Sequence, residues 1–190
     1  MNYSGRRIFK KIKPIIWILS LVCSLLPSFL LNFVWAMSSP FSGVIAIGIR
    51  YLIIKSKAKE IGNNVYIGKA VTIKNIHNLC IGSNVSIHDG CYIDSIGGVD
   101  IGCDTSIAHQ TSLVSFDHTW NDGSLAIKYN PTVLRKISIG DDVWIGCGVR
   151  VLSGSNIKHR TIIAAGSVVK GECDSHSIYA GVPARKVKDI

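Results

Sequence analysis

The sequence predicts an all-β fold, a parallel β-helix preceded by a helical segment and interrupted by one ejected loop. Aliphatic residues recur every six or eight positions, and a small or branched residue follows four positions after most of them. Glycine often comes directly after the aliphatic residue, as at Gly62 and Gly82. The two-residue alternation and hairpin signals of an ordinary sandwich are absent from the sequence. The aliphatic series is Ile61, Ile67, Ile73, Ile81, Ile87, Ile93, Ile101, Ile107, Leu113, Ile139, Ile145, Val151, Ile157, Ile163 and Val169.

Each six-residue unit is expected to form a short strand and a tight corner. Three units close a triangular coil, and coils stabilise one another as nearest neighbours because no single coil can bury its own apolar surface. Asn63–Asn64 and Asp141–Asp142 suit corners that need unusual backbone angles. Two-residue insertions within His77–Cys80 and Gly97–Asp100 should bulge outward from the same corner.

The composition limits the partners. The chain has 190 residues, with 21 Lys+Arg against 12 Asp+Glu, which gives a net charge of +9. A basic protein favours lipid headgroups, nucleic acid or a phosphorylated cofactor. No basic run is interleaved with stacking aromatics, so we expect no nucleic-acid partner. The six cysteines form no CxxC pair, so we expect no metal site and reduced thiols that serve as small core residues.

Residues 1–58 form a basic and apolar segment. Met1–Lys13 carries five cations, whereas Ile15–Ile49 contains no Asp, Glu, Lys or Arg. This stretch is too long for a signal peptide, and Pro27 and Ser38–Pro40 divide it into shorter helical pieces. Both flanks are basic, and positive charge marks the cytoplasmic side. The segment is therefore expected to be a membrane-associated hairpin on the cytoplasmic face of a bacterial inner membrane.

The second helical piece, Phe41–Ile54, is expected to lie near the membrane surface, with Trp35 and Tyr51 as interfacial anchors. The alternative is a helical cap buried over the first coil of a cytoplasmic protein, because a β-helix needs its open end covered. One segment can serve both purposes.

Residues 59–190 form the expected β-helix domain. Residues 114–136 break the repeat, and a loop ejected from a regular scaffold is usually functional. The coils resume at Ile137, and the tail 177–190 is expected to fold back over the last coil.

Three stretches of the chain carry a family resemblance: IGDDVWIGCGVRVLSGSNI (139–157), IIAAGSVVKG (162–171) and AGVPARKV (180–187). In this order, and with the interrupting loop, residues 61–190 resemble the hexapeptide-repeat acyltransferases. The most similar groups are the galactoside and maltose O-acetyltransferases and the acetyltransferases of capsule, O-antigen and exopolysaccharide assembly. The resemblance implies a left-handed β-helix, a homotrimer, and acyl transfer from acetyl-CoA.

The family's catalytic histidine stands at the start of the ejected loop, and that position is His118 here. An imidazole suits a general base that removes the acceptor's proton during attack on a thioester. Asp117 or a backbone carbonyl would orient the ring. No cysteine lies in the loop, so a covalent cysteine mechanism is not expected.

The resemblance also assigns the acetyl-CoA groove between neighbouring β-helices. Trp144 corresponds to the tryptophan that walls its reactive end, and the backbone at two other positions would bind pantetheine. Cations near the C-terminus would pair with phosphates. The expected cofactor-binding residues are Trp144, Cys147, Ala165, Lys170, Arg185 and Lys188.

The acceptor side departs from the simple sugar acetyltransferases, whose Asn and Asp are replaced here by His88 and Ile96. Small soluble sugars are therefore not the expected acceptors. His88 and Asp94, with Asp89, are the polar candidates for acceptor binding.

The function that these features favour is a membrane-associated O-acetyltransferase acting on a hydroxyl of a lipid-linked saccharide. One alternative is an N-acyltransferase that uses the same base on an amino sugar or a soluble amine. Another is a non-catalytic β-helix scaffold, which would be distinguished by tightly held zinc.

Overall fold

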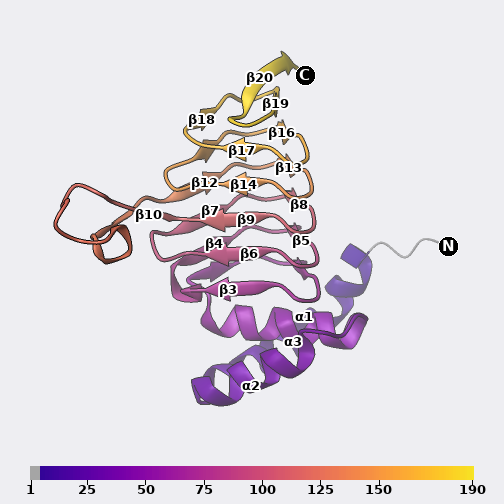
Figure 1. Ribbon diagram of the computed structural model, residues 1–190. Coiled ribbons are helices and arrows are strands. Elements are labelled where there is room, and N and C mark those ends of the chain that lie inside the picture. The colour runs from indigo at the N-terminus through magenta and orange to yellow at the C-terminus, as the bar shows by residue number, and fades with distance from the viewer. Residues whose placement is uncertain (1–4) are drawn as a thin grey trace.

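A computed structural model describes residues 5–190 as a left-handed parallel β-helix standing on a layer of three helices (Figure 1). The prism has three flat faces, each a parallel sheet. The first sheet contains β1 (Glu60–Ile61), β4 (Leu79–Ile81), β7 (Val99–Ile101), β12 (Ile137–Ile139), β15 (Asn156–Ile157) and β18 (Glu172–Cys173). The second contains β2 (Tyr66–Ile67), β5 (Ser86–Ile87), β8 (Ser106–Ile107), β13 (Trp144–Ile145), β16 (Thr161–Ile163) and β19 (Ser177–Ala180), with β20 (Arg185–Asp189) antiparallel at its edge. The third contains β3 (Thr72–Lys74), β6 (Tyr92–Asp94), β9 (Ser112–Val114), β14 (Arg150–Val151) and β17 (Val168–Val169).

The predicted repeat register is confirmed. Ile61 pairs with Ile81, and Ile81 pairs with Ile101, so the two-residue insertions do not disturb the stacking. The short helix η1 (Ile76–Asn78) occupies the first insertion. Thirteen of the fifteen predicted aliphatic positions are buried, and Ile61 and Ile73 in the lowest coil are half-buried. The core is therefore a column of stacked aliphatic side chains.

The corners use the predicted polar residues. Asn64 and Asp142 adopt positive φ angles of 55° and 54°, as the sequence indicated. Asn64 donates through Nδ2 to Asn84 Oδ1 at 3.0 Å, and Asn84 donates to Asp104 Oδ1 at 3.0 Å. This ladder of side-chain hydrogen bonds fixes the coil spacing along one edge. Glycine is required at position 102, because an added Cβ would lie 2.4 Å from the carbonyl carbon of the next coil.

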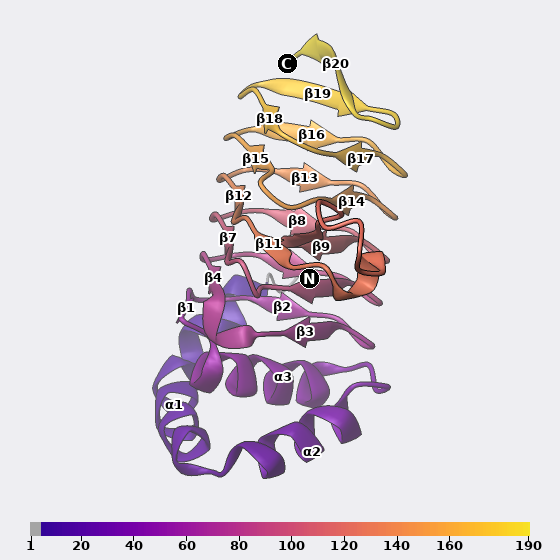
Figure 2. The ribbon, with the colours of Figure 1, turned by 60° about the vertical axis from the view of Figure 1, so that its left-hand side comes forward.

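The apolar segment forms three helices, α1 (Gly5–Leu25), α2 (Ser28–Ser38) and α3 (Val44–Lys57). The breaks fall at Pro27 and directly after Ser38, where the sequence placed them. Figure 2 shows α3 directly under the first coil and α2 beyond it, farther from the prism. Among the described helices, none combines the length and the unbroken apolar character that crossing a bilayer requires.

Helix α3 closes the open end of the β-helix. Tyr51 and Ile54 are 4% and 0% exposed and belong to the same core as the coils. Arg50 is also buried, and it donates through Nε to Ile67 O at 3.0 Å and through Nη1 to Ser38 O at 2.6 Å. The prediction that Tyr51 is an interfacial anchor is therefore wrong, because an unpaired coil end offers this ring a better apolar surface than lipid would.

Tyr51 gives the cap a measurable pH dependence. Its hydroxyl donates to Gly62 O at 3.0 Å, and burial raises the pKa of Tyr51 to about 12. The folded state then holds the phenol proton more tightly than the unfolded state, whose pKa is about 10. The free energy of unfolding should be independent of this group below pH 10 and fall by about 1–2 kcal/mol between pH 10 and 12. Chemical denaturation of Tyr51→Phe should lack this decrease, and an identical pH profile would contradict the assignment.

The ejected loop leaves the third sheet after β9. Strand β10 (Phe116–His118) pairs antiparallel with β11 (Thr132–Leu134), and the helix η2 (Ile127–Tyr129) lies in the tip between them. Both ends of the loop meet at Ser115, whose carbonyl accepts from Arg135 N at 3.0 Å. The loop is therefore a small hairpin with a fixed base (Figure 1).

Candidate active site

His118 ends the outgoing strand of this hairpin and is exposed. The start of the hairpin is anchored by Ser115, which is fully buried and donates through Oγ to Asp94 O at 2.7 Å. The ring contacts Phe116 edge-on, with centroids 5.9 Å apart. The imidazole is thus carried by a rigid pair of strands while remaining open to an incoming molecule.

His118 lines an open cavity of about 340 Å³. Trp120 and Asn121 come from the outgoing arm of the loop, and Arg135 comes from the returning arm. Lys170, which follows β17 on the same face, completes the wall. The cavity therefore brings one base together with Lys170 and with an ion pair between Arg135 and Asp117.

Asp117 lines the same cavity as His118, but its carboxylate has other partners. Its Oδ2 accepts from Ser153 Oγ at 2.6 Å and lies 3.4 Å from Arg135 Nη1. Among the hydrogen bonds of the described residues, none joins Asp117 to His118. The structure therefore does not support Asp117 as the group that orients the ring, and it indicates that Asp117 fixes the base of the loop.

Asp117→Asn tests this arrangement. The amide can still accept from Ser153, so the loop should keep its place and acetyl transfer should fall less than about tenfold. If Asp117 instead held the histidine tautomer, as in a catalytic triad, the loss would approach 10⁴-fold. Steady-state kinetics on the variant separate the two results, with Ser153→Ala as a control that removes the same hydrogen bond from the other side.

Trp144 and His118 lie on different faces of one chain. Trp144 belongs to β13 of the second sheet and is 55% exposed, whereas the loop departs from the third sheet. Trp144 lines its own cavity of about 240 Å³ together with Arg160, Ile162 and other residues. One chain alone therefore does not place this tryptophan beside the imidazole.

Cys147 and Ala165 stack at the edge between these two faces. Gly166 N donates to Cys147 O at 2.9 Å, so the two corners are adjacent. The hydrogen bonds within the described part of the chain use neither the N–H of Cys147 nor that of Ala165. Two outward backbone donors on one edge fit an extended amide chain such as pantetheine.

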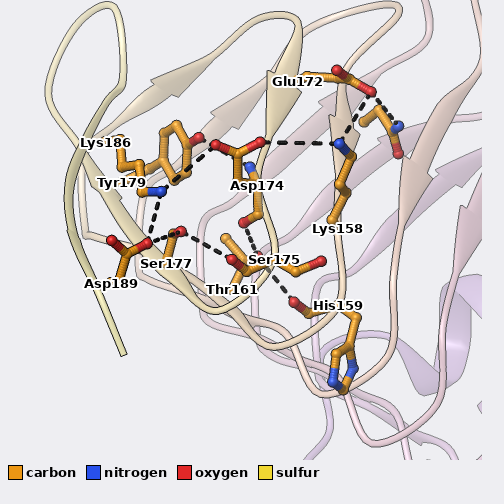
Figure 3. Close-up of polar contacts among 11 residues, drawn as sticks. Lys158, His159, Thr161, Glu172, Asp174, Ser175, Ser177, Tyr179, Lys186 and Asp189 are labelled. Atoms are coloured by element: carbon orange, nitrogen blue, oxygen red, sulfur yellow. Dashed lines mark hydrogen bonds and ion pairs between the residues drawn. The ribbon is translucent and has the colours of Figure 1, made fainter.

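Arg185 and Lys188 are exposed on β20, which folds back over the last coil as predicted. Figure 3 shows what holds this strand. Lys186 Nζ lies 2.7 Å from Asp189 Oδ1 and 3.7 Å from Asp174 Oδ2 of the last coil. The bond from Lys186 lowers the pKa of Asp189, which keeps this carboxylate ionised. Both acidic groups beside this strand pair with Lys186, and in the described part of the chain no ion pair involves Arg185 or Lys188.

The two acceptor candidates have different surroundings. His88 is exposed and lines an open cavity of about 440 Å³ with Tyr66, Asp89 and His109. Asp94 is buried, and its Oδ1 accepts from Asn75 Nδ2 at 2.8 Å and from Ile96 N at 3.2 Å. His88 is therefore open to an incoming molecule, whereas Asp94 holds a coil corner together.

Several site residues were not identified from the sequence. Arg135 and Ser153 fix Asp117, and Tyr66 and His109 lie beside His88 in its cavity. The position of Ser153 near the start of the loop could have been read from the repeat. Ser153 stands two positions after Val151, and Val151 pairs with Leu113, which directly precedes the loop. Within residues 5–190, no group of three or more His, Cys, Asp or Glu side chains is placed to hold a metal ion.

Comparison with known proteins decides the family. The family described as bacterial transferase hexapeptide (six repeats) matches residues 136–171. A hexapeptide-repeat acetyltransferase of Vibrio cholerae, solved with acetyl-CoA, superposes with a TM-score of 0.74 at 23% identity and covers 84% of each chain. Residues 136–171 belong to this hexapeptide family, and the chain has the fold of the hexapeptide-repeat acetyltransferases.

Two curated relatives of this hexapeptide-repeat chain match with higher identity. A probable acetyltransferase of Mycobacterium tuberculosis is 33% identical over 131 residues, which is 68% of this chain and 44% of the relative. An Escherichia coli protein named for O-acetyl transfer in lipopolysaccharide biosynthesis is 36% identical over 112 residues, covering 55% and 57%. The chain thus spans about half the length of these relatives.

Proposed function

We propose that the protein is an acetyl-CoA-dependent O-acetyltransferase that acts on a saccharide hydroxyl. The observation that carries this proposal is His118, held at the rigid base of the loop in a cavity whose wall includes Arg135 and Lys170. Imidazole is the side chain best suited to act as a base at neutral pH, and the ring of His118 is exposed. The relative named for lipopolysaccharide O-acetyl transfer supports a glycan acceptor.

In the proposed reaction, His118 removes the proton of the acceptor hydroxyl as the oxygen attacks the thioester carbonyl carbon of acetyl-CoA. The resulting tetrahedral oxyanion collapses and breaks the carbon–sulfur bond. The imidazolium then returns the proton to the departing thiolate, so that the products are an acetyl ester and CoA. Cations in the cavity would stabilise the negative charge that develops on the oxyanion.

The donor site would be shared between chains. Trp144 and the free backbone donors of Cys147 and Ala165 lie around the edge from His118 in a single chain. A neighbouring copy packed against that edge would place its loop beside them, and the exposed Trp120 supports such contact. A homotrimer is therefore the assembly that we propose.

Arg185 tests the donor assignment. If its guanidinium pairs with a phosphate of acetyl-CoA, Arg185→Ala should raise KM for acetyl-CoA about 10-fold and leave kcat within twofold, because the contact is made equally in the ground and transition states. Lys59→Ala removes an exposed cation at the opposite end of the prism and serves as the control. Equal KM values in both variants and the wild type would contradict the assignment.

The second candidate is N-acyl transfer to an amino sugar. The Escherichia coli dTDP-4-amino-4,6-dideoxy-D-glucose acyltransferase is 29% identical over 157 residues and covers 82% of that relative, which favours this candidate specifically. Assays with matched hydroxyl and amino sugars separate the two, since the product is an alkali-labile ester in one case and a stable amide in the other.

The acceptor is proposed to be lipid-linked, and the enzyme to work at the cytoplasmic face of the membrane. The departure of the acceptor positions from the simple sugar enzymes and the uncharged helical segment support this location. Mass spectrometry of cellular glycans with and without the protein identifies the acceptor.

A further inference from the structure

The helical layer exposes an apolar surface that a protein in water would not keep. Of the exposed large apolar side chains in the described part of the chain, more than half lie within residues 15–45. Leu25, Phe29 and Ile45 are 81%, 75% and 82% exposed. An open apolar groove of about 330 Å³, lined in part by Phe33 and Met37, continues this surface from α2 toward the start of α3. We name the exposed side chains of residues 15–45 the apolar helix surface.

Helix α1 shows that the exposure is not a by-product of packing. Its only half-buried positions in 13–25 are Ile16, Ser20 and Cys23, which lie three or four residues apart and form one narrow stripe. The remaining positions are exposed, and apart from Lys13, Pro14 and Ser24 they are large and apolar. A helix at a water interface normally carries charged residues opposite its buried face. This helix therefore needs an apolar environment on most of its circumference.

The charges beside this surface identify the occupant. Residues 1–59 contain no Asp or Glu, and Lys55, Lys57 and Lys59 follow one another at the end of α3. Lys57 Nζ donates to Asn32 Oδ1 at 3.2 Å, so a cation stands at the edge of α2 itself. Exposed apolar area bordered by cations alone matches an anionic lipid bilayer, in which the side chains enter the acyl region and the cations meet the headgroups.

We propose that the apolar helix surface docks in the interface of an anionic lipid bilayer and holds the β-helix end-on to the membrane. This deepens the proposed function, on which the lipid-linked nature of the acceptor rests. Because α2 is the helix farthest from the prism, insertion of α2 directs the stacked coils away from the bilayer (Figure 2). A second copy docked layer to layer is disfavoured, because it would face lysines with lysines and offer no acidic partner in residues 1–59.

This orientation determines how far His118 lies from the membrane surface. The loop of His118 departs from β9, which is the third coil above the helical layer. Coils are spaced by about 4.8 Å and packed helices by about 8–10 Å, so His118 would lie on the order of 25 Å from the outer face of α2. A lipid-linked acceptor would then present a hydroxyl on a sugar remote from its lipid anchor.

Vesicle binding by the full chain tests the docking. Purified protein diluted from detergent should co-sediment with vesicles of phosphatidylcholine and phosphatidylglycerol, and much less with phosphatidylcholine alone. The exposed double variant Phe29→Asp/Phe33→Asp should bind at least tenfold more weakly, whereas Val187→Asp, at the opposite end of the prism, should bind as the wild type does. Deleting the layer is not a clean test, because Tyr51 and Ile54 close the core.

Tryptophan quenching tests the orientation. Lipids with brominated acyl chains should quench a fraction of the fluorescence. The double variant Trp17→Phe/Trp35→Phe, which removes both tryptophans of the helical layer, should abolish that fraction. Trp120→Phe and Trp144→Phe should retain it, because these rings lie at the level of the coils. The inference would be overturned if quenching disappeared in Trp120→Phe or Trp144→Phe. It would also be overturned if Phe29→Asp/Phe33→Asp bound vesicles as tightly as the wild type, or if the protein formed layer-to-layer dimers and did not bind vesicles.

These outcomes are separate from the proposed function. Acetyl transfer to a water-soluble saccharide does not need the bilayer, so Phe29→Asp/Phe33→Asp should retain it. If Phe29→Asp/Phe33→Asp loses vesicle binding but keeps acetyl transfer, the result agrees with both the docking proposal and the proposed function. If the wild-type protein transfers acetyl groups but does not bind vesicles, only the docking proposal is refuted. If it binds vesicles but has no transferase activity, only the proposed function is refuted.

Discussion

His118→Ala should lower kcat for acetyl transfer by about 100-fold or more while leaving KM for acetyl-CoA within about threefold. A positioned general base contributes about 10²–10⁴-fold to such a reaction, and the imidazole is the base that the loop presents to the cavity. The groups proposed to hold the donor lie on other elements, so donor binding should survive. Initial-rate kinetics with a thiol-detecting assay give both constants.

His159→Ala is the matched control for this prediction. His159 is also exposed at a coil corner, and its ring contacts only His176 among the aromatic pairs of the described residues, with centroids 5.2 Å apart. Its removal should leave kcat unchanged. A His118→Ala variant that keeps the wild-type kcat, with the fold verified by circular dichroism, would refute His118 as the base.

Arg50→Met should destabilise the junction between the helical layer and the first coil by about 2–3 kcal/mol. Arg50 donates to the carbonyl groups of Ile67, Ser38 and Phe41 at distances of 2.6–3.1 Å. Methionine fills the volume but leaves buried acceptors unsatisfied, at about 1–3 kcal/mol each. Burial lowers the pKa of Arg50, and this desolvation of the guanidinium offsets part of the loss.

Arg50→Met should loosen the structure around α3 and the first coil without affecting the upper coils. Hydrogen exchange in α3 and in β2 should accelerate by one to two orders of magnitude, whereas exchange in the upper coils should be unchanged, because coils are stabilised mainly by their neighbours. Lys55→Met, on the same helix, removes a half-exposed cation and should have little effect. Equal exchange in the two variants would contradict the role assigned to Arg50.

The repeat made most of the β-helix predictable. The spacing of the aliphatic series sets which side chain stacks on which, so the pairing of Ile61 with Ile81 follows from counting. The loop is predictable for the same reason, because it is the place where the regular spacing of the aliphatic residues is interrupted. His118 was then found from its position at the start of the loop, on the strength of a resemblance rather than of its own chemistry.

The contacts that escaped prediction are those between elements far apart in sequence. The hydrogen bond from Arg50 to Ile67 joins a helix to a coil, and an isolated arginine in an apolar segment carries no signal of burial. The link between Asp117 and Ser153 spans the whole loop. Adjacent placement in sequence suggested that Asp117 serves His118, but the carboxylate of Asp117 accepts from Ser153 and pairs with Arg135 instead.

The measurement that tests the central account most directly is a structure of the full chain with CoA bound. The account predicts the CoA sulfur within reach of an acceptor that hydrogen-bonds His118, which places the sulfur about 4–6 Å from an imidazole nitrogen. It further predicts the pantetheine arm against the N–H groups of Cys147 and Ala165 of an adjacent copy. A sulfur placed well beyond the His118 cavity, or a pantetheine arm that avoids this edge, would contradict it.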